Sequence, residues 1–230
     1  MFFDPMYFVF ALPALLLALY AQARVRSTYA KYSQVPNASR LTGAEVARHL
    51  LDAAGLQNVP VERVPGDLTD HYDPGSRVVR LSDSNYASYS VAALGVTAHE
   101  VGHAIQHATM YGAMRLRTAL VPVAGIGSNL GYILFIAGFF IASLQLATVG
   151  LVLFSSAALF AAVTLPVEYN ASNRAMSLLT EQGLVSSDDA GLAKKVLDAA
   201  ALTYVAGLAQ ALSQVLYFAF LLSGMRRSDD

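Results

Sequence analysis

No charged residue occurs between Arg117 and Glu168, and this stretch constrains the fold more than any other part of the chain. A helix needs roughly 20 apolar residues to cross the hydrocarbon core of a bilayer, so the stretch is long enough for two crossings. We expect spans over residues 120–143 and 147–167, joined by a tight turn near Gln145. This part of the chain is therefore predicted to be a transmembrane helical hairpin.

Two further apolar segments lie near the ends of the chain. The first covers residues 7–23, and basic residues follow it instead of preceding it, which favours a membrane anchor over a cleaved signal peptide. The last covers residues 199–222. Only 13% of the residues are charged and 55% are hydrophobic, whereas roughly a quarter of a soluble domain is charged. The chain is predicted to be a mainly α membrane protein with about four transmembrane helices.

The distribution of basic residues predicts the orientation in the membrane. Of the 15 Lys and Arg residues, ten lie within residues 24–117 and three within residues 168–198. The positive-inside rule therefore places both segments in the cytoplasm and both termini on the opposite side. Arg226 and Arg227 argue against this placement of the C-terminus.

Charge and cysteine content restrict the function. The net charge of -1 gives no electrostatic reason to expect a nucleic acid partner. The chain has no cysteine, which excludes disulfides, thiolate zinc sites and cysteine nucleophiles. His, Asp and Glu remain as the candidate metal ligands.

A His-Glu-x-x-His motif occupies residues 99–103. Apolar residues spaced three and four apart predict a helix around it, with Ser90 as the N-cap. Residues four apart share a helix face, so His99 and His103 can direct imidazole nitrogens at one cation, which we expect to be zinc. Glu100 could hydrogen-bond a metal-bound water and act as the general base. The same motif also arises by chance on solvated helices.

A catalytic zinc site typically has three protein ligands and one position open to water. His107 continues the row of histidines, but on a straight helix it lies about 12 Å from His99 along the axis, which is too far for both to bind one ion. Gln106 and Thr109 stand where the metzincin pattern requires a glycine and a histidine, which excludes that class.

A carboxylate from a second helix is the remaining option, and Glu168 is the candidate. It ends the stretch without charges, and an acidic residue at a membrane boundary needs a compensating partner. Two partners fit equally well: a zinc ion, or interfacial water together with Arg174.

Three short segments precede the motif helix at residues 59–64, 68–72 and 77–81, separated by turn residues that include Pro and Gly. They predict a short antiparallel sheet, preceded by a helix with a capping box formed by Thr42 and Glu45. An edge strand of such a sheet could bind an extended peptide.

A polar and aromatic segment adjoins this predicted sheet. His71 and Tyr72 could donate hydrogen bonds to the oxyanion of a tetrahedral intermediate, and Asp70 or Asp73 could orient a zinc-ligating imidazole. Tyr204, at the start of the last span, is a further candidate donor. The alternative is an exposed turn and an interfacial aromatic residue without catalytic roles.

Together these features resemble the family of membrane-bound neutral zinc metallopeptidases typified by YugP. The matching stretches are residues 41–47, 61–66, 68–74, 98–107, 116–122, 164–168 and 202–206. The resemblance covers most of the chain and implies a membrane zincin with proteolytic activity.

A more distant similarity is to HtpX-type membrane proteases, whose third-ligand helix carries Glu-x-x-Ala-Asp. Glu168 and Ala171 match this pattern, which implies that Glu168 is the third ligand. Ser172 replaces the aspartate that holds a zinc-ligating histidine in those enzymes. The candidates to supply that hydrogen bond instead are Asn170, Asn173 and Asp70.

The expected organisation has five parts, with a small zincin-like α+β catalytic region at the membrane surface. They are an anchor (1–23), the zincin-like region with the motif helix (24–117), the hairpin (118–167), a third-ligand helix and surface segment (168–198), and a last span with its tail (199–230).

The predicted function is that of a zinc metalloendopeptidase with a gluzincin-like ligand set. Zn²⁺ bound by His99, His103 and Glu168 would activate water for peptide hydrolysis, with Glu100 as the base. The expected partners are the lipid bilayer and a protein or peptide substrate, and the expected location is a bacterial cell membrane with a cytoplasmic active site. The alternatives are a non-catalytic zinc-binding protein and an assembly or scaffold factor in which the motif is incidental.

Overall fold

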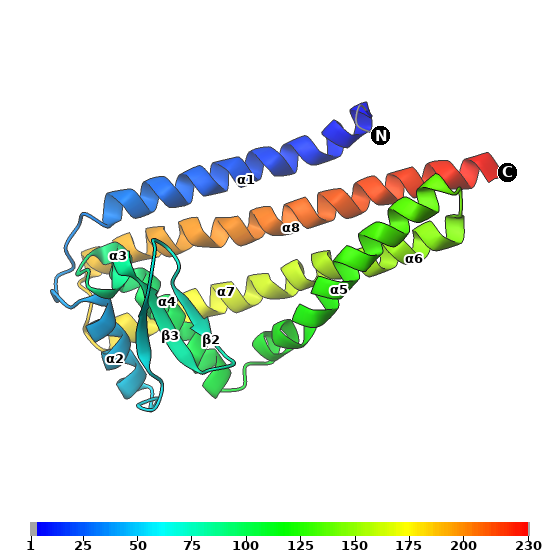
Figure 1. Ribbon diagram of the computed structural model, residues 1–230. Helices are drawn as coiled ribbons and strands as arrows, with labels where there is room; N and C mark the ends of the chain where they lie inside the picture. The colour runs from blue at the N-terminus through cyan, green and yellow to red at the C-terminus, as the bar shows by residue number, and fades with distance from the viewer. Residues whose placement is uncertain (1–3, 230) are drawn as a thin grey trace. The chain divides into compact units, whose positions relative to one another are not determined.

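The computed structural model describes residues 4–229 (Figure 1). These residues contain eight helices and three strands, joined by loops. In chain order they are α1 (Pro5–Tyr32), α2 (Gly43–Ala53), β1 (Val61–Val64), β2 (His71–Asp73), β3 (Val78–Ser82), α3 (Asp83–Tyr86), α4 (Val91–Ala108), α5 (Gly112–Phe140), α6 (Leu144–Phe154), α7 (Ser156–Glu181) and α8 (Ser187–Asp229). The predicted mainly α fold with a small sheet is confirmed.

The described chain divides into two compact units. The helical unit contains residues 4–21, 115–166 and 203–229, and the sheet unit contains residues 22–114 and 167–202.

Four helical segments are long and apolar enough to cross a membrane, as predicted. They are Pro5–Tyr32, Gly112–Phe140, Leu144–Glu181 and Ser187–Met225. The chain is therefore a multi-pass membrane protein. The turn of the predicted hairpin lies at residues 141–143, and Gln145 already belongs to the first turn of α6.

Close packing holds α5 against α6 in the helical unit. A Cβ atom added to Gly131 would lie only 2.7 Å from the carbonyl oxygen of Gly150, so the two backbones meet where neither helix has a side chain. Phe135 of α5 also stacks on Phe218 of α8 with ring centroids 4.1 Å apart. These contacts fix the helices by shape, which is how helices associate in lipid.

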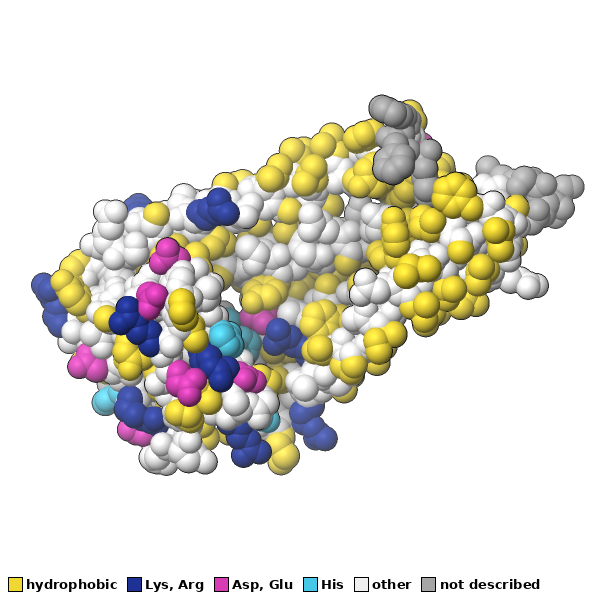
Figure 2. Space-filling model, in the orientation of Figure 1, with side chains coloured by type: hydrophobic (Ala, Val, Ile, Leu, Met, Phe, Trp, Pro, Cys, Tyr) yellow, Lys and Arg dark blue, Asp and Glu magenta, His cyan; other side chains and the backbone are white. Residues whose placement is uncertain are grey.

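Large apolar side chains cover the outside of the helical unit, as Figure 2 shows for one face. Val9, Ile126 and Val152 are each more than 60% exposed. Such a continuous apolar surface is typical of contact with lipid chains. The lipid bilayer is therefore the environment of this unit.

The sheet of the second unit is mixed, and the prediction of a purely antiparallel sheet was wrong in this respect. Its strand order is β1-β3-β2, with β2 antiparallel and β1 parallel to β3. The chain reverses after β1 and again after β2, so β3 runs in the direction of β1 and inserts between the other two strands. β1 and β2 are the edge strands.

Local signals in the sequence place the helices around this sheet. The capping box at the start of α2 is confirmed, because Thr42 accepts from the N–H of Glu45 and the Glu45 carboxylate accepts from that of Thr42. Ser90 caps α4 by accepting from the N–H of Ala93 at 3.1 Å. The core of the sheet unit includes fully buried Leu50, Leu81, Leu94 and Leu179, which come from α2, β3, α4 and α7.

We expect Leu81→Ala to destabilise the sheet unit by about 2–5 kcal/mol, because it removes a fully buried side chain from the central strand. The same change at Leu68, which is 42% exposed, is the control and should cost much less. Thermal unfolding of the detergent-solubilised protein, followed by circular dichroism, measures both. Equal losses of stability would contradict the central role of β3.

Candidate metal centre

Helix α4 presents two imidazole rings to the same point. His99 and His103 are one turn apart, their ring planes are nearly perpendicular at 86°, and their Nε2 atoms are 3.1 Å from each other. This is the arrangement that the spacing of four residues predicted.

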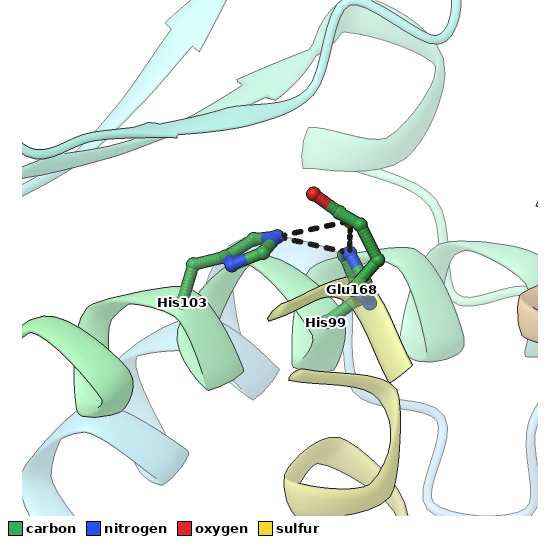
Figure 3. A group of neighbouring side chains, drawn as sticks. All are labelled: His99, His103 and Glu168. Atoms are coloured by element: carbon green, nitrogen blue, oxygen red, sulfur yellow. Dashed lines mark hydrogen bonds and ion pairs between the residues drawn. The ribbon is translucent and has the colours of Figure 1, made fainter. Parts of the chain in front are cut away.

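Glu168 of α7 supplies the third polar atom. Its Oε2 atom lies 3.1 Å from Nε2 of His99 and 3.4 Å from Nε2 of His103, and only 2% of its side chain is exposed. Figure 3 shows the carboxylate and both rings converging from the two helices. These three residues form a group that could hold a metal ion.

Gly102 allows the two helices to come this close. A Cβ atom at this position would lie 2.6 Å from the carbonyl oxygen of Ala171 in α7, closer than Cβ atoms are found in proteins. Helix α4 therefore contacts the backbone of α7 directly. In α4 the contact lies between the two histidines, and in α7 it lies about one turn after Glu168. The glycine of the motif is a packing requirement of the site.

Each imidazole has a partner at its second nitrogen. Nδ1 of His103 lies 3.0 Å from Oε1 of Gln106, and Nε2 of this buried glutamine donates to the carbonyl oxygen of Val167 and to Oδ1 of Asn170. An amide oxygen only accepts, so Nδ1 of His103 carries the proton and Nε2 is left with a lone pair. Nδ1 of His99 is 3.1 Å from Oγ of Ser172.

The geometry of the three atoms fits zinc. In tetrahedral coordination with bonds of about 2.0–2.1 Å, neighbouring ligand atoms are about 3.3–3.4 Å apart. The observed separations of 3.1, 3.1 and 3.4 Å are close to this value. Two imidazole nitrogens and a buried carboxylate oxygen at such distances attract a cation, because lone pairs and negative charge face one another.

Glu100 contacts the sheet through one oxygen of its carboxylate. Its side chain is buried, and Oε2 accepts a hydrogen bond of 2.9 Å from the backbone N–H of Tyr72 in β2. Because this N–H is directed at α4, the Tyr72–Val79 pair is a non-hydrogen-bonded pair of the β2–β3 ladder. The outer edge of β2 therefore faces the motif helix at Glu100.

The surroundings shift the pKa values of His103 and Tyr72. Burial lowers the pKa of His103, but the nearby carboxylates of Glu168 and Glu100 outweigh burial and raise it overall. Burial raises the pKa of the Tyr72 phenol, so this group stays protonated at neutral pH.

The structure places the other predicted residues as follows. Asn170 reaches His103 through Gln106, while Asn173 is exposed. The carboxylate of Asp70 accepts from Ser82 and Asn85, and so holds the end of β3 and not an imidazole.

His71 and Tyr72 lie in β2 but differ in their surroundings. His71 is exposed and its Nδ1 contacts the carbonyl oxygen of Thr69. The Tyr72 hydroxyl contacts Nδ1 of His107 at 2.8 Å. Tyr204 belongs to the part of α8 in the helical unit, and its role as an oxyanion donor stays a prediction.

Sequence reasoning did not assign roles to Gln106 and Ser172. Ser172 occupies the place of the expected aspartate and contacts His99 itself, so this hydrogen bond does not need Asn170, Asn173 or Asp70. Gln106 lies three residues after His103, and an uncharged polar residue at that spacing on a buried face is the signal that could have found it.

Comparison with known proteins agrees with this site. A family described as "Putative neutral zinc metallopeptidase" matches residues 7–223. The chain belongs to this family. "Putative membrane protease YugP" of Bacillus subtilis (strain 168) is 46% identical over 217 residues, which cover 94% of this chain and 96% of that protein. No solved structure matches the chain.

Membership of the neutral zinc metallopeptidase family confirms the resemblance found in the sequence. It implies Zn²⁺ as the cofactor, and the group of His99, His103 and Glu168 is present for it. It also implies a peptide substrate. The similarity to HtpX-type proteases and the individual roles of the site residues stay predictions.

We expect Gly102→Ala to weaken zinc binding about tenfold or more, because the added methyl group separates α4 from α7 and moves Glu168 away from the imidazoles. Zinc per protein, measured by elemental analysis at several chelator concentrations, tests this. Gly112→Ala is the matched control, because a Cβ atom there has nothing within 4 Å. Unchanged zinc retention in Gly102→Ala would contradict the packing role.

Gln106→Ala should also weaken zinc binding, by about 10–100-fold, because Nδ1 of His103 loses the group that orients the ring. Chelator competition on the purified protein gives the dissociation constant. Gln57→Ala removes an exposed glutamine of the same unit and should leave the constant unchanged.

Proposed function

We propose that this protein is a zinc metalloendopeptidase that hydrolyses peptide bonds in membrane proteins or in proteins close to the membrane. His99, His103 and Glu168 hold the metal, and Glu100 is the general base. The observation that carries the proposal is the convergence of two imidazoles and a buried carboxylate on one point, with a second carboxylate on the neighbouring residue of the same helix.

The number of ligands supports a catalytic site over a structural one. Structural zinc sites are closed by four protein ligands, whereas catalytic sites have three and keep one position for water. Among the described residues, the group contains three. Zn²⁺ bound by them lowers the pKa of water to about 7 and polarises a carbonyl oxygen.

Glu100 is placed to move a proton. The residue is 8% exposed, and Oε2 of its carboxylate accepts a hydrogen bond from the N–H of Tyr72. During hydrolysis one carboxylate oxygen accepts a proton from water, and the same group returns that proton to the leaving amine. In a non-catalytic zinc protein this carboxylate would serve only to hold β2 through the N–H of Tyr72.

Edge strand β2 supports a peptide as the substrate. An extended chain can pair with an open strand edge through main-chain hydrogen bonds, which do not depend on its sequence. Tyr72 directs its backbone N–H to the side of Glu100. A peptide bound along β2 would therefore run past the general base.

The chain segments that form the site support a cytoplasmic location. The sheet unit holds most of the basic residues of the chain, which the positive-inside rule assigns to the cytoplasm. Glu168 directly follows the stretch without charges. We infer that the substrates are membrane proteins, their cytoplasmic tails, or unfolded segments near a bacterial cell membrane.

Glu100→Gln should keep the fold and the zinc but lose about 10²–10⁴-fold in hydrolysis, because the amide cannot accept the proton. Two assays test this: cleavage of fluorescently labelled casein, and comparison of the membrane proteomes of cells that carry the wild type or the variant. An active Glu100→Gln protein would refute the base assignment.

Glu168→Ala is the companion variant and should lose zinc along with activity, since it removes a ligand and leaves two imidazoles. Zinc analysis of both variants separates the two roles. Purified wild-type protein without zinc that regains none from solution would favour the assembly-factor alternative.

A further inference from the structure

A third histidine of α4 has no part in the proposed function. His107 lies one turn after His103, and its Nδ1 atom is 2.8 Å from the hydroxyl of Tyr72. The two rings also meet edge to face with centroids 5.8 Å apart. A phenol is protonated at neutral pH, so the O–H of Tyr72 can donate to Nδ1 of His107.

Tyr72 contacts α4 at two places. Its side chain reaches His107, and its backbone N–H donates to Glu100 at 2.9 Å. The two helix residues are seven apart, which is about two turns and returns to the same face. Tyr72 therefore lies along α4 and links the base to the third histidine.

Strand β2 depends on this link for its position. It has only three residues and pairs with β3 on one side alone. Its first residue, His71, is exposed, and Asp73 is hydrogen-bonded to the turn residue Ser76 and to Arg80 of β3, not to α4. Within β2, the hydrogen bonds of Tyr72 join the strand to the motif helix.

We propose that His107 is a positioning residue: by holding the Tyr72 hydroxyl, it keeps the β2 edge against α4 and the backbone N–H of Tyr72 on Glu100. This inference rests on the proposed function of Glu100. His107 acts through Tyr72 and does not touch the group of three residues that holds the metal.

The test compares variants that remove the same hydrogen bond from either side. His107→Ala and Tyr72→Phe should each lower kcat/KM for labelled casein about three- to tenfold, the size expected for one hydrogen bond. The double variant should lose no more than either single one, because both changes break one contact. Zinc content should stay at the wild-type value in all three.

A conservative variant and a control separate positioning from general damage. His107→Asn places an amide group near the position of Nδ1 and should restore most of the activity. His49→Ala removes an exposed histidine of α2 in the same unit and should behave as the wild type. Hydrogen exchange of the peptide containing residues 70–73 should be faster in His107→Ala and Tyr72→Phe, and close to normal in His107→Asn.

Three results would overturn the inference: wild-type activity and exchange in both single variants, additive losses in the double variant, or loss of zinc in His107→Ala. Glu100→Gln is assayed alongside. If it is inactive while His107→Ala is normal, only the role of His107 fails. If Glu100→Gln is active, the proposed function itself fails.

Discussion

A buried carboxylate facing two imidazole nitrogens is the interaction on which the rest of the sheet unit depends. An ionised group out of water costs several kcal/mol unless a partner compensates it. Glu168 is almost fully buried and meets Nε2 of both His99 and His103. A divalent cation would interact favourably with the carboxylate and with both imidazole nitrogens at once. The packing around these three groups therefore keeps negative charge and lone pairs together at a candidate metal site.

The surroundings of this group are arranged to keep it in one geometry. Gly102 brings the backbones of α4 and α7 into contact, and Ser172 and Gln106 each take the second nitrogen of one ring. Such outer partners fix the ring orientation and the tautomer of metal-binding histidines. Backbone contact sets the distance between the helices, and the hydrogen bonds set the direction of the ligand atoms.

The sequence predicts those features that depend on local patterns. Helix α4 follows from its apolar spacing and from the Ser90 cap, and two of the four membrane spans follow from the stretch without charges before Glu168. The assignment of Glu168 as a ligand needed more, because a carboxylate at a membrane boundary has two explanations. The similarity to HtpX-type proteases favoured zinc, and the position of Glu168 beside both imidazoles agrees with that prediction.

What the sequence could not predict depends on contacts between distant residues. The parallel pairing of β1 with β3 is set by which strand inserts between the others, and turn residues do not encode this choice. The contact of Tyr72 with His107 joins residues 35 positions apart, so neither residue alone indicates it. The replacement of an aspartate by Ser172 suggested that a hydrogen bond to a histidine would be lost. The serine side chain is shorter than that of aspartate, yet its Oγ still contacts Nδ1 of His99.

The ligand set of this centre contains nitrogen and oxygen but no sulfur, since the chain has no cysteine. Peroxide, disulfides and alkylating reagents react first with thiolates, and this chain contains no thiol. Oxidation or alkylation of a thiol therefore cannot alter the candidate ligand group.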